Sequence, residues 1–205
     1  MPVRPRFRSS FIVLAILALV LGAALLAYSR WSEPLVQAAG ALEAGDAAQA
    51  VERYAAGADR YQRLPATQQL FSADHALASR NQLALLYQLE RYDEVLEAAV
   101  NAPPDAAPHF WAGCALFRKS MAEEQATSQL ELLTRAEDEF KLALETAPDD
   151  WDTKFNYELS ARLAADLRPP TKKGGTQQKS VPSTLMQLLR RAPQQQQDRP
   201  VKKVG

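Results

Sequence analysis

The sequence predicts an all-α protein in which one transmembrane helix is followed by a short array of helix pairs and a disordered tail. Three observations predict this fold class. Residues 11–28 form an uncharged apolar run, residues 33–167 are rich in Ala, Leu, Glu and Gln without strand-like alternation, and residues 168–205 are rich in Pro, Gln and Lys. We therefore divide the 205-residue chain into an N-terminal segment (1–10), an anchor (11–30), a repeat domain and a tail.

The apolar run is long enough to cross a bilayer, because eighteen helical residues span about 27 Å. Arg4, Arg6 and Arg8 precede the run, and Arg30 alone follows it closely. The positive-inside rule therefore places the N-terminus in the cytoplasm and the repeat domain across the membrane, which is the periplasm if the host is Gram-negative and the membrane its inner one. A cleaved signal peptide is the competing interpretation, but the run exceeds the usual apolar core of about 7–15 residues.

The formal net charge of zero conceals an acidic body and a basic tail. Residues 31–167 carry 11 basic and 23 acidic groups, a net charge of −12. Residues 168–205 carry nine basic groups and one acidic group, a net charge of +8. The acidic body disfavours nucleic-acid binding, whereas the division of charge indicates an interaction within the molecule or with a partner.

The clearest repeat lies near the end of the body. Ala136, Phe140, Ala143 and Pro148 follow the small, aromatic, small and proline spacing of the second helix of a tetratricopeptide repeat (TPR). Small side chains let two helices approach, the aromatic ring fills the gap between neighbouring pairs, and the proline ends the helix. An ordinary amphipathic hairpin is the alternative.

A further helix is expected to follow this repeat and to cap the array. Asp149 or Asp150 can cap its N-terminus, and Phe155, Leu159 and Leu163 recur at four-residue steps on one face.

Two weaker repeats precede it. In the first, residues 35–60, the helices meet at Gly45-Asp46, and Ala50, Tyr54 and Gly57 occupy the small, aromatic and small positions. Pro65 interrupts the connection that follows.

The second repeat spans 74–101, with Val95 and Ala99 at its packing positions and Pro103-Pro104 at its end. The third begins near Pro108, and its helical pattern runs on through Leu133. The separations from Ala50 to Val95 and from Val95 to Ala136, 45 and 41 residues, exceed the TPR period of about 34, so both links carry insertions. We expect about three helix pairs and a capping helix.

The end of the body also resembles a known group. Residues 149–159, DDWDTKFNYEL, contain Asn156, Tyr157, Glu158 and Leu159 as an Asn-x-Glu-Leu core. The last repeat followed by this stretch, together with the anchor, the body and the tail, resembles small membrane-anchored TPR proteins that accompany MoxR-type ATPases and von Willebrand factor A proteins, both MxaK-like and BatC-like. The resemblance implies that such proteins are the partners. It also implies a role in maturation or metal insertion of a periplasmic enzyme of the methanol-oxidation type, or in envelope stress tolerance.

Two sets of residues are candidates for partner binding. Repeat arrays grip peptides on a concave surface, and the first helix of each pair is expected to line it. This predicts Leu83, Tyr87, Trp111 and Phe155 as contacts. In the tail, Ser183 can cap a short helix whose apolar face would be formed by Leu185, Met186, Leu188 and Leu189. That helix would bind a groove of a partner or of the chain's own body, or it is inert disorder.

The sequence contains no recognisable catalytic, cofactor or metal site. His75 and His109 lack partners at zinc-ligand spacing and are expected at the surface or in loops. No glycine-rich phosphate-binding motif occurs. Asp149, Asp150 and Asp152 are explained more simply by helix capping than by calcium, and Cys114, the single cysteine, is expected to be buried.

We therefore expect a non-catalytic scaffold or assembly factor that binds proteins. Two other interpretations stay open. One is a periplasmic chaperone associated with the protein translocon, which would bind many unfolded clients. The other is a structural envelope protein that associates with itself.

Overall fold

The computed structural model describes residues 6–63 and 70–169, and all the regular structure within them is helical. The all-α prediction is confirmed. The helices are α1 (Arg6–Glu43), α2 (Ala47–Arg63), α4 (Ser72–Gln88), α5 (Tyr92–Val100), the short 3-10 helix η1 (Pro104–Ala106), α6 (Pro108–Ala122), α7 (Ala126–Thr146) and α8 (Trp151–Leu167). The predictions for Pro65 and for the whole tail, including Leu185, Met186, Leu188 and Leu189, lie outside the described residues.

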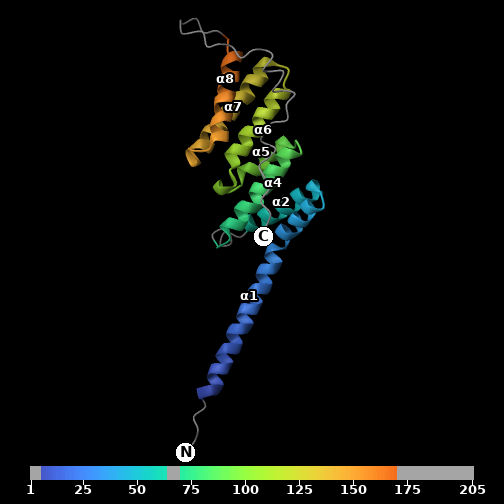
Figure 1. Ribbon diagram of the computed structural model, residues 1–205, viewed down its shortest axis with the longest axis vertical. Helices are drawn as coiled ribbons and strands as arrows, with labels where there is room; N and C mark the ends of the chain where they lie inside the picture. The colour runs from blue at the N-terminus through green and yellow to red at the C-terminus, as the bar shows by residue number, and fades with distance from the viewer. Residues whose placement is uncertain (1–5, 64–69, 170–205) are drawn as a thin grey trace, which may run out of the picture.

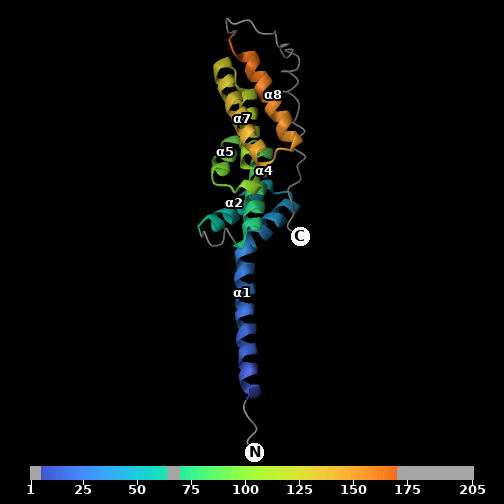
Figure 2. The ribbon, with the colours of Figure 1, turned by 90° about the vertical axis from the view of Figure 1, so that its left-hand side faces the viewer.

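Helix α1 projects from a stack of shorter helices, and its N-terminal part stands clear of the rest of the chain (Figures 1 and 2). Its apolar part is long and apolar enough to cross a membrane, and it is not buried against the other helices. The sequence separated an anchor at 11–30 from a domain starting at residue 33. In the structure, the anchor and the first helix of the domain instead form one continuous helix of 38 residues.

Pro34 lies inside this helix, where the anchor meets the helix stack. A proline has no amide hydrogen, so the carbonyl group of Arg30, four residues earlier, lacks its helical partner. Arg60 of α2 supplies the missing donor, because its Nη1 lies 2.9 Å from the Arg30 oxygen and 3.3 Å from the Trp31 oxygen. This contact ties α2 to the helix at the level where the apolar run ends.

The first helix pair is formed by the end of α1 and by α2. Gly45 adopts a left-handed conformation with a φ of 79° in the turn between them, and Asp46 Oδ1 accepts a hydrogen bond from the Gln49 amide at 2.9 Å. Ala50, Tyr54 and Gly57 are all buried in α2. A Cβ atom at Gly57 would lie 2.7 Å from Leu35 Cδ1, so the absence of a side chain allows the two helices to approach closely.

The remaining helices pack in chain order, α4 on α2, α5 on α4, α6 on α5, α7 on α6 and α8 on α7. The sequence predicted that the third repeat runs as helix through Leu133. That prediction was wrong, because α6 ends at Ala122 and α7 begins at Ala126. The helical periodicity continues across the short turn, so composition alone does not reveal the break.

Helix α7 carries the packing motif on its buried face. Ala136, Phe140 and Ala143 are buried against the neighbouring helices. Gly113 of α6 faces Phe140, and a Cβ atom there would lie 2.7 Å from the ring carbon Cε1. Pro148 lies exposed in the turn after α7.

Asp150 caps α8, because its Oδ1 accepts a hydrogen bond from the Asp152 amide at 3.1 Å. The buried face of this helix differs from the one predicted. Phe155 is 66% exposed and points outward, whereas Leu163 is buried with Thr153, Asn156 and Ser160.

His75 corrects the expectation of a surface or loop histidine. It lies in α4, is buried, and its ring centroid lies 5.6 Å from that of Tyr61. Its Nε2 atom has no hydrogen-bond partner among the described residues. Burial lowers the pKa of His75, because the charged imidazolium loses hydration there.

This burial predicts a pH-dependent stability. Because the pKa of His75 is lower in the folded state, the unfolded chain binds more protons as the pH falls below about 6.5. The contribution of neutral His75 to the free energy of unfolding is therefore fully present above that pH, and it is lost as the pH falls toward the folded-state pKa. We expect His75→Phe to show a smaller drop in melting temperature than wild type between about pH 7.5 and about pH 5.5. An identical drop in melting temperature in both proteins would contradict buried His75 as a source of the pH dependence.

Candidate partner-binding groove

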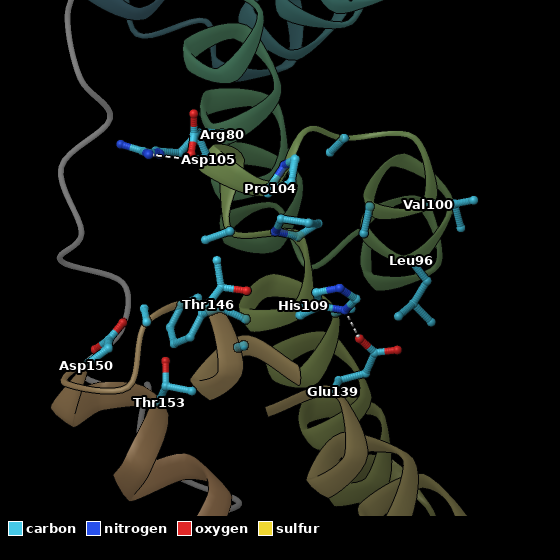
Figure 3. Close-up of a pocket in the computed structure, with 18 of the residues that line it drawn as sticks. Arg80, Leu96, Val100, Pro104, Asp105, His109, Glu139, Thr146, Asp150 and Thr153 are labelled. Atoms are coloured by element: carbon cyan, nitrogen blue, oxygen red, sulfur yellow. Dashed lines mark hydrogen bonds and ion pairs between the residues drawn. The ribbon is translucent and has the colours of Figure 1, made fainter. Parts of the chain in front are cut away.

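A groove of about 700 Å3 lies over the start of α6, between α5 and α7 (Figure 3). In Figure 3, Leu96 and Val100 of α5 stand on one side of it, and Asp150 and Thr153 at the start of α8 stand on the other. The link around η1 closes a third side. The groove therefore joins the second helix pair (α4 and α5), the third pair (α6 and α7) and the capping helix α8.

The α5 side and the link form an apolar wall. Leu96, Ala99 and Val100 come from the last two turns of α5, and Pro104 belongs to η1. Val100 is 80% exposed, although it is a large aliphatic side chain. A partner that covered this wall would remove apolar surface from water, which favours binding.

Polar groups line other parts of the groove. His109 Nδ1 lies 2.8 Å from Glu139 Oε2, and this pair links the first turn of α6 to α7. Arg80 of α4 donates a hydrogen bond to the Asp105 carbonyl oxygen of η1, which ties the link to the helix stack. Arg135 of α7 also lines the groove. The surface thus combines an apolar wall with fixed donors and acceptors.

His109 was expected in a loop or at the surface, and its side chain is 46% exposed at the surface, where it lies in the first turn of α6 and contacts a carboxylate. Its side chain hydrogen-bonds to Glu139 alone among the described residues. No group of three or more His, Cys, Asp or Glu side chains in the described part of the chain could hold a metal ion. The arrangement suits recognition by hydrogen bonds and apolar contact.

A second, smaller hollow of about 330 Å3 repeats the arrangement one helix pair earlier. It lies between α2 and α5, over α4, and its polar rim includes Glu52, Arg91 and Glu94. Arg91 Nη2 lies 2.6 Å from Glu94 Oε2 and 4.0 Å from Glu52 Oε1. Each hollow therefore lies between the second helices of two consecutive pairs, α2 and α5 for the smaller hollow and α5 and α7 for the groove.

The sequence predicted partner contacts on the first helices, but the structure buries three of the four residues that it named. Leu83 and Tyr87 of α4 and Trp111 of α6 are buried, and the Tyr87 and Trp111 ring centroids lie 5.6 Å apart. These helices lie between two or more neighbours, so their apolar side chains are covered. Cys114 is also buried in α6. Burial raises the pKa of the Tyr87 hydroxyl, because the charged phenolate would lose its hydration there.

Phe155, the fourth predicted contact, is exposed but lies outside the lining of the groove. The residues that do line it were missed by sequence reasoning. The available signal was the insertion at Pro103-Pro104, since the link that lengthens the repeat spacing also forms one wall. Neither the exposure of Val100 nor the His109–Glu139 pair has a local sequence signature.

No protein-family model, curated protein or solved structure matches this chain. The features of this chain that bear on its function are the groove, the apolar part of α1, and the division of charge between an acidic body and a basic tail.

Proposed function

We propose that this protein is a non-catalytic, membrane-anchored scaffold that binds a protein partner through the groove between α5 and α7. The observation that carries the proposal is the open apolar wall around Leu96 and Val100, which lines the same groove as the paired His109 and Glu139 and as Arg135. An apolar anchor combined with a few oriented hydrogen-bonding groups is the usual arrangement in grooves that bind a helical or extended peptide.

The size and position of the groove favour a peptide segment. A volume of about 700 Å3 could hold several side chains, and the groove draws on α5, η1, α6, α7 and the start of α8. A partner bound there would contact two helix pairs at once, as in TPR-type arrays that bind peptides along the stack. The second hollow beside Arg91 would extend the contact toward α2.

We propose a single-pass location in the inner membrane, with the N-terminus in the cytoplasm and the helix stack in the periplasm. The apolar part of α1 and the arginines at positions 4, 6 and 8 support this orientation. An anchored domain is held close to the bilayer, so it would meet membrane-bound partners at a high effective concentration.

The resemblance of residues 136–163 to the MoxR and von Willebrand factor A accessory group suggests that these two classes supply the partner. Purification of the tagged protein from its own membranes in mild detergent, with mass spectrometry of the bound proteins, tests this. A von Willebrand factor A protein or a MoxR-type ATPase in near-equal amount would support a dedicated assembly factor. Translocon subunits with a broad mixture of clients would overturn that function in favour of a chaperone.

Val100→Asp should remove the partner without unfolding the protein. The side chain is exposed, so the stability change is expected within about 0.5 kcal/mol, whereas a bound apolar surface would have to accept a desolvated carboxylate. Val36→Asp is the matched control, because Val36 is 61% exposed on α1 and does not line the groove. Quantitative co-purification of both variants checks this, and an equal loss of partner in both would contradict the groove as the binding surface.

A further inference from the structure

A separate hollow of about 450 Å3 lies where α1 leaves the helix stack, at the end of the apolar run. Ala27, Arg30 and Trp31 of α1 line it together with Arg60 and Arg63 from the last turn of α2. Three arginines from two helices thus line the hollow beside the final apolar turn of the candidate membrane helix, mostly through their apolar atoms.

The contacts of these arginines differ. Arg60 donates to the carbonyl oxygens of Arg30 and Trp31, which explains its place in the fold. Arg63 pairs with Asp59 at 2.5 Å, while its side chain stays 75% exposed. Among the described residues Arg30 makes no ion pair, although it is exposed at the same level. Asp59 does not line the hollow, and the hollow's walls are mostly apolar, so the charged ends of these arginines contribute little to them.

Trp31 and Ala27 form the apolar side of the hollow. Trp31 is half-buried, and its ring packs edge-to-face on Tyr61 with centroids 5.9 Å apart. Ala27 belongs to the apolar run itself. Tryptophan side chains favour the boundary between headgroups and acyl chains, so the hollow straddles that boundary if α1 spans the membrane.

We propose that this hollow binds an anionic glycerophospholipid, with the phosphate held by Arg30 and Arg63 and the glycerol and upper acyl chain against Ala27 and Trp31. Guanidinium groups bind phosphate oxygens in a bidentate geometry, which a neutral surface cannot offer. A soluble phosphate would leave the apolar wall exposed to water, whereas a lipid covers both sides. This inference depends on α1 lying in a bilayer, but it is independent of any partner in the groove.

The bound lipid would fix the domain relative to the membrane. Arg60 already ties α2 to α1 at Pro34, the point where α1 lacks one helical hydrogen bond. A phosphate between Arg30 of α1 and Arg63 of α2 would bridge the same two helices from the membrane side. The helix stack, and with it the groove, would then have a defined orientation above the bilayer.

Quenching of Trp31 fluorescence by brominated lipid tests the proposal on the full-length protein. The protein is placed in phosphatidylcholine vesicles that contain an equal minor fraction of either brominated phosphatidylglycerol or brominated phosphatidylcholine. A Trp31→Phe variant measures the signal of the other two tryptophans, Trp111 and Trp151. We expect stronger quenching of Trp31 by the brominated phosphatidylglycerol, whereas equal quenching by the two lipids would overturn the proposal.

Three variants separate a site from general charge attraction. Arg30→Gln and Arg63→Gln should each lower the preference for phosphatidylglycerol about ten-fold, with circular dichroism unchanged, because each removes a charge-assisted hydrogen bond to the bound phosphate. Arg53→Gln, two turns before Arg60 on α2, removes the same charge outside the hollow and should keep the preference. An equal loss in Arg53→Gln would overturn the site, and displacement of the lipid by millimolar inorganic phosphate would show a soluble-anion site instead.

Discussion

Replacement of Trp111 by alanine is expected to lower the free energy of unfolding by about 3–5 kcal/mol. Trp111 is only 3% exposed in α6, and its ring lies with centroids 5.2 Å from Phe110 and 5.6 Å from Tyr87. Truncation removes a large buried apolar surface and leaves a cavity between α4 and α6, because the close-packed neighbours relax only in part. Urea denaturation of the full-length protein in mild detergent, followed by circular dichroism, measures the loss.

Trp151→Ala is the matched control for this change. Trp151 is 78% exposed at the start of α8, and its main contact is the Lys154 ammonium group, 5.0 Å from the ring centroid. We expect a loss within about 1 kcal/mol, the usual contribution of an exposed cation–π pair. If Trp111→Ala left the urea midpoint as little changed as Trp151→Ala but abolished partner binding, Trp111 would be a contact residue and its buried position would be wrong.

Phe140→Ala is expected to have a comparable effect, again about 3–5 kcal/mol. Phe140 occupies the space that the missing side chain of Gly113 leaves between α6 and α7, and its ring centroid lies 6.3 Å from that of Phe110. Removal of the ring therefore loses the packing against Gly113 and Phe110 together.

Phe155→Ala is the corresponding control, since it deletes the same side chain from an exposed position on α8. We expect a change within about 0.5 kcal/mol, as for most surface substitutions. Thermal unfolding of the two variants in parallel provides the comparison. Equal melting temperatures for Phe140→Ala and Phe155→Ala would contradict the packing of α6 on α7.

The helix pairs could be anticipated from the sequence because their determinants are local. A small residue, an aromatic and a second small residue at positions 136, 140 and 143 specify a close helix contact wherever the partner helix lies. Gly45 similarly marks a turn that requires a left-handed residue. These features depend on neighbours within a few residues, so the all-α repeat-like packing could be predicted.

The candidate groove could not be predicted in the same way, because it depends on which face each helix presents. Apolar periodicity indicated that Leu83, Trp111 and Phe155 lie on helix faces, but burial separates them, and only Phe155 is exposed. The long-range contacts of His109 with Glu139 and of Arg60 with the Arg30 carbonyl group join residues about thirty positions apart. No local pattern records such pairs.

The continuity of α1 was missed for a related reason. A proline after an apolar run usually marks a helix end, because it lacks the amide hydrogen and crowds the preceding turn. Here the Arg60 side chain replaces the missing donor at the Arg30 carbonyl group, so the helix continues through Pro34. The compensating group comes from a different helix, and the local sequence does not reveal it.

Site-specific photocrosslinking in native membranes tests whether the groove between α5 and α7 binds a protein partner. A photoreactive amino acid at position 100 lies in the wall of the groove, and one at position 36 lies on α1 outside it. We expect one defined protein adduct from position 100 and none of the same mass from position 36. Adducts of equal yield from both positions, or none from position 100 while the protein co-purifies with a partner, would contradict the groove as the binding surface.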